Sequence, residues 1–126
     1  MPVVFVRALR PSDPDRVDAL LASVPAALEQ AAGVPRARTW VSFTALDAQA
    51  IGPRGVHDPA EGVAFVELLL RDRGPERVAR AMEAVAEATA AALGLPLTEV
   101  WLTTRFVASG GLFAGGAVQR WTEAVE

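Results

Sequence analysis

The sequence contains no cysteine, tyrosine or lysine and only one histidine. The absence of cysteine excludes a disulfide framework, a thiol nucleophile and a cysteine-based metal site. A single histidine also disfavours a metal site built from side chains. We therefore expect no metal and no other cofactor. The 12 basic side chains are all arginines, dispersed along a chain of net charge -3, which disfavours nucleic acid as a partner.

Long hydrophobic runs are also missing, although 52% of the residues are hydrophobic and the mean hydropathy is +0.27. No apolar run approaches the roughly 20 residues that span a bilayer, so we expect no membrane association. The apolar stretch at residues 2–6 is soon interrupted by Arg7 and Arg10 and does not resemble a signal peptide, so we expect a cytoplasmic protein. The apolar excess must be buried by protein, which predicts a homo-oligomer.

The sequence consists of two related halves. Shifting it by 61 positions without a gap aligns identical or similar residues, which include Arg10 with Arg71, Gly33-Val34-Pro35 with Gly94-Leu95-Pro96, and Trp40 with Trp101. We interpret the 126 residues as one domain made of two repeats, 1–46 and 62–116, joined by a linker at 47–61. The repeats differ at their start, because Pro2 aligns with Val63.

Each repeat has the pattern of a β-α-β unit. Short, apolar segments rich in β-branched residues predict buried strands, and these lie at residues 3–9, 38–45, 63–70 and 99–107. A proline predicts the start of each helix, at Pro14 and Pro75, and a glycine predicts each end, at Gly33 and Gly94. Pro25 lies inside the first helix and predicts a kink there.

These units predict an α/β (α+β) protein with four strands and two helices. A β-α-β crossover joins parallel strands, and the two helices cover one face of the sheet. The other face then needs a partner chain. The glycine-rich segment 110–116 predicts a tight hairpin that closes the sheet edge, and it lacks the lysine and the setting of a phosphate-binding loop. His57 lies in the linker, and we expect it to be solvated rather than catalytic.

The terminal proline suggests a catalytic base. Once the initiator methionine is removed, Pro2 exposes a secondary amine. Burial and neighbouring positive charge both disfavour the protonated amine, so an apolar pocket with arginines would lower its pKa toward neutral pH.

With these residues the chain resembles the tautomerase superfamily, whose members work with an amino-terminal proline. The second repeat is similar to 4-oxalocrotonate tautomerase from Phe65 to Val118, chiefly in the segments 93–100 and 111–116, and the first repeat is similar more weakly from Pro2 to about Thr44. The whole chain resembles the fused members, which include malonate semialdehyde decarboxylase and cis-3-chloroacrylic acid dehalogenase. The resemblance implies a mixed four-stranded sheet of the tautomerase/MIF-like fold.

The resemblance also implies a site. In this family the first strands of the two units pair antiparallel, which would bring Arg71 near Pro2. Arg71 and Arg73 are two residues apart, so they point the same way in an extended segment, and they match an Arg-x-Arg pair of the decarboxylase. Guanidinium groups suit a carboxylate, and their charge depresses the pKa of the proline. The equivalent site near Arg10 and Val63 has no terminal amine and is interpreted as vestigial.

Three departures from the family narrow the chemistry. Trp40 and Trp101 stand where 4-oxalocrotonate tautomerase has a substrate-binding arginine in its last strand. The dehalogenase activates water with a tyrosine and a glutamate, and this chain has no tyrosine. The decarboxylase has an aspartate just after its first helix, where this chain has Arg38. Hydration, dehalogenation and decarboxylation are therefore less favoured than tautomerisation.

The sequence therefore predicts an isomerase that interconverts the enol and keto forms of a small 2-oxo acid. Pro2 would be the general base and Arg71 and Arg73 would hold the carboxylate, with Arg38, Trp101 and Phe113 as further substrate-binding residues; the two aromatic residues could equally serve core or trimer packing. One alternative is a decarboxylase, hydratase or dehalogenase acting on a three-carbon oxo or unsaturated acid. Another is a non-enzymatic trimeric binding protein. The resemblance implies assembly as a trimer.

Overall fold

The computed structural model describes residues 1–50, 55 and 58–122, so His57 lies outside the described residues. The elements along the chain are β1 (Val3–Leu9), α1 (Asp15–Ala32), the 3-10 turn η1 (Arg36–Arg38), β2 (Trp40–Leu46), η2 (Pro59–Glu61), β3 (Ala64–Leu70), α2 (Pro75–Leu93), η3 (Leu97–Glu99), β4 (Val100–Phe106), β5 (Leu112–Ala114) and β6 (Ala117–Gln119).

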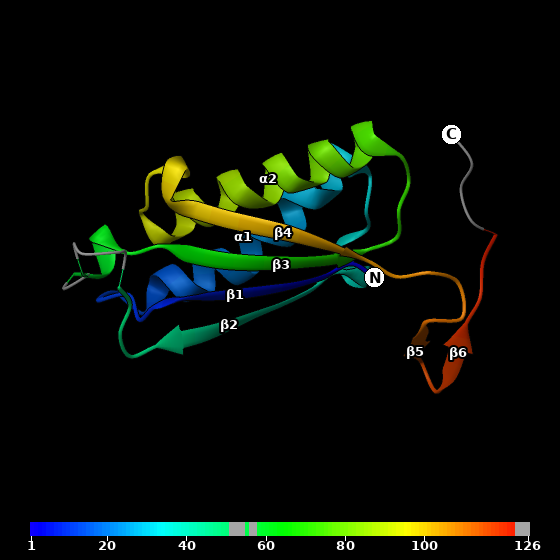
Figure 1. Ribbon diagram of the computed structural model, residues 1–126, viewed down its shortest axis with the longest axis horizontal. Helices are drawn as coiled ribbons and strands as arrows, with labels where there is room; N and C mark the ends of the chain where they lie inside the picture. Colours follow the sequence, from blue (N-terminus) through cyan, green and yellow to red (C-terminus); the bar gives the residue numbers. More distant parts are fainter. Residues whose placement is uncertain (51–54, 56–57, 123–126) are drawn as a thin grey trace.

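Strands β1 to β4 form one mixed sheet in the order β2-β1-β3-β4. Within each half of the chain the two strands are parallel, and the two halves join through antiparallel β1 and β3. Both helices lie side by side over the same face of this sheet (Figure 1). The predicted fold class and the four main strands are therefore confirmed.

The helix ends follow the local chemistry, with one difference from the prediction. Helix α2 begins at Pro75, whose missing N–H costs nothing in the first turn. Helix α1 begins at Asp15, so Pro14 takes the capping position, and the Asp13 carboxylate accepts a hydrogen bond from the Asp15 N–H at 2.9 Å. The helix continues through Pro25 without a break.

Alternating side chains of each central strand enter the core. Those that face the helices are buried, and they are Val4, Val6 and Ala8 of β1 and Ala64, Val66 and Leu68 of β3. They pack against apolar rows of α1 and α2, chiefly Leu20, Val24, Leu28, Ala81 and Val85. Burying one such valine or leucine side chain contributes about 1.5–3 kcal/mol to the stability of the fold. This layer between the sheet and the helices is therefore the hydrophobic core.

The opposite face of the sheet is not covered by either helix and carries large exposed side chains. Phe5 and Phe65 point away from the helices, and so do Trp40 and Trp101. Phe65 lies beside Trp101 in the register of β3 with β4. Each chain therefore presents a broad aromatic surface on one side of its sheet.

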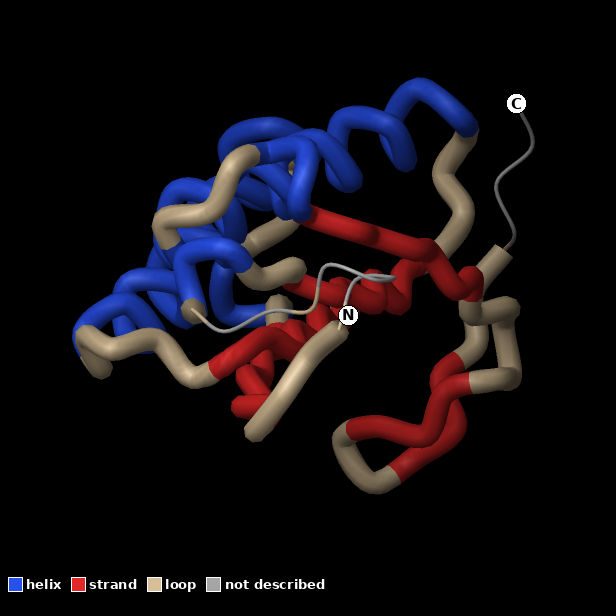
Figure 2. Tube along the Cα trace, turned by 60° about the vertical axis from the view of Figure 1, so that its left-hand side comes forward, coloured by secondary structure: helices blue, strands red, loops and turns tan. Residues whose placement is uncertain are grey.

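The glycine-rich segment forms the predicted hairpin but not at the predicted place. Strands β5 and β6 pair only with each other, in a separate two-stranded sheet. Figure 2 shows this hairpin standing apart from the main sheet. Its turn uses Gly115 and Gly116 at positive φ of 60° and 82°, a conformation that favours glycine. The expectation that the hairpin closes the edge of the main sheet is therefore wrong.

In the part of the chain that the structure describes, neither helix has the length and hydrophobicity needed to cross a membrane.

Candidate active site

The antiparallel pairing of β1 with β3 brings the first residues of the chain beside the end of β3. Val3 lies opposite Leu69, so Pro2 lies beside the residues that follow Leu69. Pro2 is buried, and its carbonyl oxygen accepts a hydrogen bond from the Trp40 N–H at 3.1 Å. The start of the chain is therefore held between β2 and β3.

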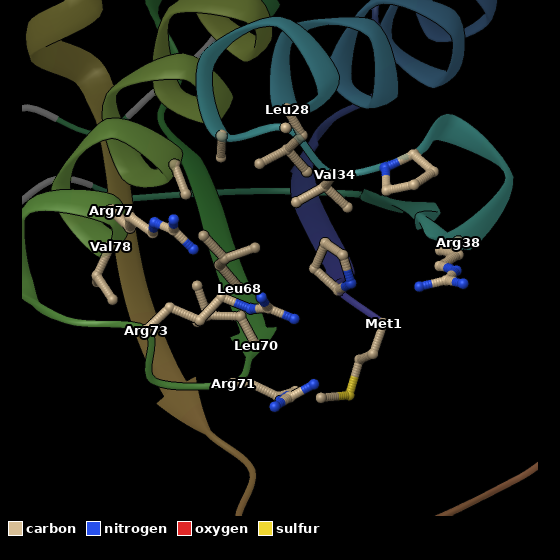
Figure 3. A pocket seen from close by; sticks show the side chains of 15 residues that line it. Met1, Leu28, Val34, Arg38, Leu68, Leu70, Arg71, Arg73, Arg77 and Val78 are labelled. Carbon is tan, nitrogen blue, oxygen red and sulfur yellow. The ribbon is translucent and has the colours of Figure 1, made fainter. Parts of the chain in front are cut away.

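A cavity of about 310 Å³ opens at this end of the sheet (Figure 3). Met1 and Pro2 line it, together with apolar side chains from the core, which are Leu28, Val34, Leu68, Leu70, Val78 and Ala81. A volume of this size suits a small ligand that is largely enclosed. The first two residues thus lie in a small cavity with an apolar wall.

Four arginines from three elements surround the same cavity. Arg38 ends η1, Arg71 and Arg73 lie in the loop after β3, and Arg77 lies in the first turn of α2. Figure 3 shows Arg38 facing Arg73 and Arg77 across the cavity, with Arg71 beside Met1. Arg71 is half-buried and the other three are exposed.

No carboxylate balances this positive charge among the described residues that line the cavity. Asp72 lies between two of the arginines, but its carboxylate accepts a hydrogen bond from the Gly74 N–H at 3.0 Å. Burial, followed by the charges of Arg71, Arg77 and Arg38, lowers the pKa of Arg73. A cluster of like charges in a partly desolvated place is unfavourable when it is empty and favours an anionic ligand.

The terminal amine responds to the same surroundings. With Met1 in place, burial first and then the charges of Arg38, Arg71 and Arg73 lower the pKa of this amine from its usual value. Both causes disfavour the protonated form. A larger share of the amine is therefore neutral, and able to accept a proton, than for an ordinary chain end.

The turn that carries Arg38 is anchored to the end of α1. The Glu29 carboxylate accepts hydrogen bonds from the Arg36 N–H at 3.3 Å and from the Arg36 Nε at 2.9 Å. These two hydrogen bonds lower the pKa of Glu29, so it stays ionised. The contact between Glu29 and Arg36 holds η1 against the end of α1, and η1 in turn positions Arg38 at the cavity.

A second cavity of about 330 Å³ lies on the other side of the arginines. It shares Met1, Arg38, Arg71 and Arg73 with the first. Its remaining wall comes from the hairpin and the tail, through Leu112, Ala114, Gly115, Gln119 and Trp121. These three arginines thus line both the first cavity and a space walled by the hairpin and Trp121.

The structure brings together part of the site that the sequence predicts. Pro2, Arg38, Arg71 and Arg73 line one cavity. Trp101 does not join them, because its partner in the register, Phe65, lies at the start of β3, at the opposite end of the sheet. Its side chain is 65% exposed.

Phe113 also stays outside the cavity within one chain. Its side chain is 70% exposed, and it lines neither of the two cavities beside the arginines. Its neighbours Leu112 and Ala114 line the second cavity. In an isolated chain, neither predicted aromatic wall therefore reaches the terminal amine.

Sequence reasoning missed two residues that lie at the arginines. Arg77 lines the first cavity and Trp121 lines the second. The position of Arg77 could have been noticed in the sequence, because a positive charge in the first turn of a helix is unfavourable with the helix dipole and so suggests a functional role. No sequence pattern indicates the position of Trp121, since it follows β6 in a segment without a periodic pattern.

At the opposite end of the sheet, the described residues around Val63 form a much smaller cavity. It measures about 10 Å³ and is lined by apolar residues such as Leu9, Leu93 and Leu95. No arginine is among the described residues that line it. The described residues also contain no group of three or more His, Asp or Glu side chains that could hold a metal ion.

No known family model matches the sequence, and no curated protein matches it. Solved structures do. A wild-type fused 4-OT (4-oxalocrotonate tautomerase) described as a symmetric trimer superimposes with a TM-score of 0.79 at 20% identity, over 93% of this chain and 94% of that one. The chain has the tautomerase fold.

Two further solved structures of this fold are of proteins treated with small reactive acids. Pt0534 inactivated by 2-oxo-3-pentynoate superimposes with a TM-score of 0.82 at 16% identity, over 93% of this chain and 95% of that one. FG41 malonate semialdehyde decarboxylase inhibited by 3-bromopropiolate gives a TM-score of 0.69 at 18% identity, over 90% and 88% of the two chains. The tautomerase fold therefore occurs here with a chain end that lies among arginines.

Proposed function

We propose that this protein is a cofactor-independent isomerase that interconverts the enol and keto forms of a small 2-oxo acid. The observation that carries the proposal is the position of the chain start in an arginine-lined cavity that lowers the pKa of the terminal amine. Removal of Met1 would make Pro2 the terminal residue. Pro2 is buried, so the same two causes apply to its amine.

The chemistry needs only a proton carrier and a carboxylate clamp. The neutral Pro2 amine takes the proton of the enol hydroxyl and returns it to carbon, so no proton is gained or lost overall. Arg71 and Arg73 bind the carboxylate and stabilise the negative charge that develops on the enolate oxygen. The cavity volume of about 310 Å³ accommodates a small acid.

Decarboxylation of a three-carbon oxo acid is the second candidate. The likeness to a malonate semialdehyde decarboxylase and the Arg71-Asp72-Arg73 segment favour it. Arg38 disfavours it, because a guanidinium stands in the cavity where the decarboxylase has an acid after its first helix. Hydration, dehalogenation and simple binding without catalysis would use the same cavity.

We further propose that three chains assemble through the open faces of their sheets. The aromatic side chains on that face support this, and so does the likeness to a fused 4-OT described as a symmetric trimer. Trp101 and Phe113 would then act at contacts between chains, where they could wall the cavity of a neighbouring copy. This assignment explains why both are exposed in a single chain.

The direct test is covalent labelling with 2-oxo-3-pentynoate followed by peptide mass mapping. A neutral Pro2 amine should add to the activated triple bond and carry the adduct on the terminal residue. The Pro2→Ala variant should lose most of the ketonisation of an enol 2-oxo acid, because the secondary amine is replaced by a primary one with altered basicity and geometry. The proposal would be rejected if Met1 is retained, if Pro2 is not labelled, or if ketonisation is unchanged in Pro2→Ala. Release of carbon dioxide from an oxo acid would favour the second candidate.

A further inference from the structure

Trp121 follows β6 and touches the candidate site. The guanidinium carbon of Arg71 lies over the ring of Trp121, at 4.5 Å from the ring centroid. The backbone N–H of Trp121 donates a hydrogen bond to Ser109 Oγ at 2.7 Å, and the Gly110 N–H donates to the Gln119 carbonyl at 2.9 Å. These bonds tie both ends of the hairpin together and hold the backbone of Trp121, whereas its indole Nε1 is buried without a hydrogen-bond partner among the described residues.

The burial of Arg71 Nε limits which edge of its guanidinium is available. Arg71 Nε is buried and has no hydrogen-bond partner among the described residues, whereas the terminal nitrogens of Arg71 are not among such buried atoms. Figure 3 shows the guanidinium end of Arg71 directed toward Met1. A carboxylate that approaches through the cavity therefore meets the two terminal nitrogens and not the Nε edge.

The orientation of the Arg71 guanidinium is energetically unfavourable in one respect. A buried donor without a partner is unfavourable, and Arg71 Nε is one. The indole offsets this through the attraction between a cation and an aromatic face. Arg71 is also the only half-buried member of the four cavity arginines. Its guanidinium is thus the most constrained of the four.

We propose that Trp121 is a positioning residue for Arg71, and that its ring holds the guanidinium so that its terminal N–H groups receive the substrate carboxylate. The inference rests on the proposed function, since the carboxylate is that of the 2-oxo acid. Trp121 itself takes no part in the proton transfer. It acts on binding, by reducing the number of orientations that Arg71 must lose when a carboxylate arrives.

The test measures the equilibrium binding of 2-oxobutanoate to the full-length protein by titration calorimetry. Trp121→Leu removes the aromatic face and keeps an apolar side chain, and it should weaken binding about 2-fold to 30-fold, the range expected for a cation over a ring. Trp121→Phe keeps a face and should recover most of this loss. In an Arg71→Met background, Trp121→Leu should have no further effect, whereas a merely structural role would leave the two effects additive.

A matched pair of reagents separates this inference from the proposed function. In 2-oxo-3-pentynoate the ketone bears a carboxylate, and in 3-pentyn-2-one a methyl group takes its place. Trp121→Leu should slow labelling of Pro2 by the first reagent and leave the rate with the second nearly unchanged. If Pro2 is not labelled at all, the proposed function fails, and the calorimetric series still decides the role of Trp121. Binding in Trp121→Leu equal to or tighter than in the wild type, or no binding of 2-oxobutanoate by the wild type, would overturn the inference.

Discussion

Val3 of β1 lies opposite Leu69 of β3 in an antiparallel pair. This register joins the end of one half of the chain to the start of the other, so Pro2 comes from the first half and Arg71 from the second. At the opposite end of the same pair the residue equivalent to Pro2 is Val63, and the cavity there measures about 10 Å³. The two halves therefore contribute different parts of one cavity at the amino terminus.

The pH dependence of Pro2 labelling should report the arginines. The neutral amine reacts, so the rate of labelling by uncharged 3-pentyn-2-one should rise with pH and level off above the pKa of the amine. Burial and the charges of Arg38, Arg71 and Arg73 lower the pKa of the terminal amine in the chain that keeps Met1. The midpoint for Pro2 should therefore lie below that of an unfolded chain, and Arg38→Met should move it upward and slow labelling at neutral pH.

Replacing one arginine should raise the pKa of the terminal amine only in part. Burial is the largest cause, so no single arginine substitution should restore the ordinary pKa of the amine. Arg80→Met provides the control, because Arg80 is exposed on α2 and lines neither arginine cavity. A midpoint that is the same in Arg38→Met and in the wild type would contradict the electrostatic account.

Arg77 should contribute to the binding of substrate and little to the proton transfer. Its guanidinium lines the cavity wall, and no carboxylate pairs with it among the described residues. A charge-assisted hydrogen bond to a carboxylate is worth about 1.5–3 kcal/mol, so Arg77→Met should raise KM about tenfold or more with kcat within a fewfold. Steady-state kinetics on the same acid would check this, with Arg80→Met as the matched control. A loss confined to kcat would instead place Arg77 at the reacting atoms.

The sequence predicts the elements and one side of the site because these depend on local patterns. Apolar periodicity and the prolines and glycines at helix ends locate the four strands and both helices. The position of Arg71 beside Pro2 follows from the antiparallel pairing implied by the family resemblance. The contact of Trp121 with Arg71 depends instead on how an irregular segment after the hairpin returns to the loop that follows β3, and no local pattern encodes this.

The two aromatic residues predicted for the site, Trp101 and Phe113, could not be placed from the sequence for a different reason. Trp101 is the second residue of β4, and the parallel pairing with β3 places it beside Phe65, far from the end of β3 that precedes Arg71. A role for Trp101 at the site would therefore need a second copy of the chain, which the proposed trimer would supply.

The glycines that end the two helices offer a matched test of stability. Gly33 and Gly94 have nearly equal φ of 69° and 68°, so Gly33→Ala and Gly94→Ala should each cost about 1–2 kcal/mol of unfolding free energy from backbone strain. A methyl group at Gly33 would meet nothing within 4 Å, whereas at Gly94 it would meet only the guanidinium of Arg16, the tip of an exposed and flexible side chain that can move aside. The two substitutions should therefore cost nearly the same in urea unfolding at matched protein concentration. A clearly larger loss for Gly94→Ala would mean that the Arg16 side chain is held in place and contributes to stability.

The open face of the sheet should be the surface through which chains associate. Phe65 is 47% exposed and lies beside Trp101 on the face that the helices leave uncovered. Sedimentation of the wild type should give three times the 13.3 kDa mass of one chain. Phe65→Glu should lower this mass, because assembly would have to remove three added carboxylates from water, although each has Arg7 of its own chain opposite it across β1 and β3. The circular dichroism should stay near that of the wild type, since the helix-facing core is untouched. Arg80→Glu on the outer surface of α2 introduces the same acid away from the sheet and should leave the mass unchanged. If Phe65→Glu sediments like the wild type, the aromatic face does not form the interface, and the exposed positions of Trp101 and Phe113 require another explanation.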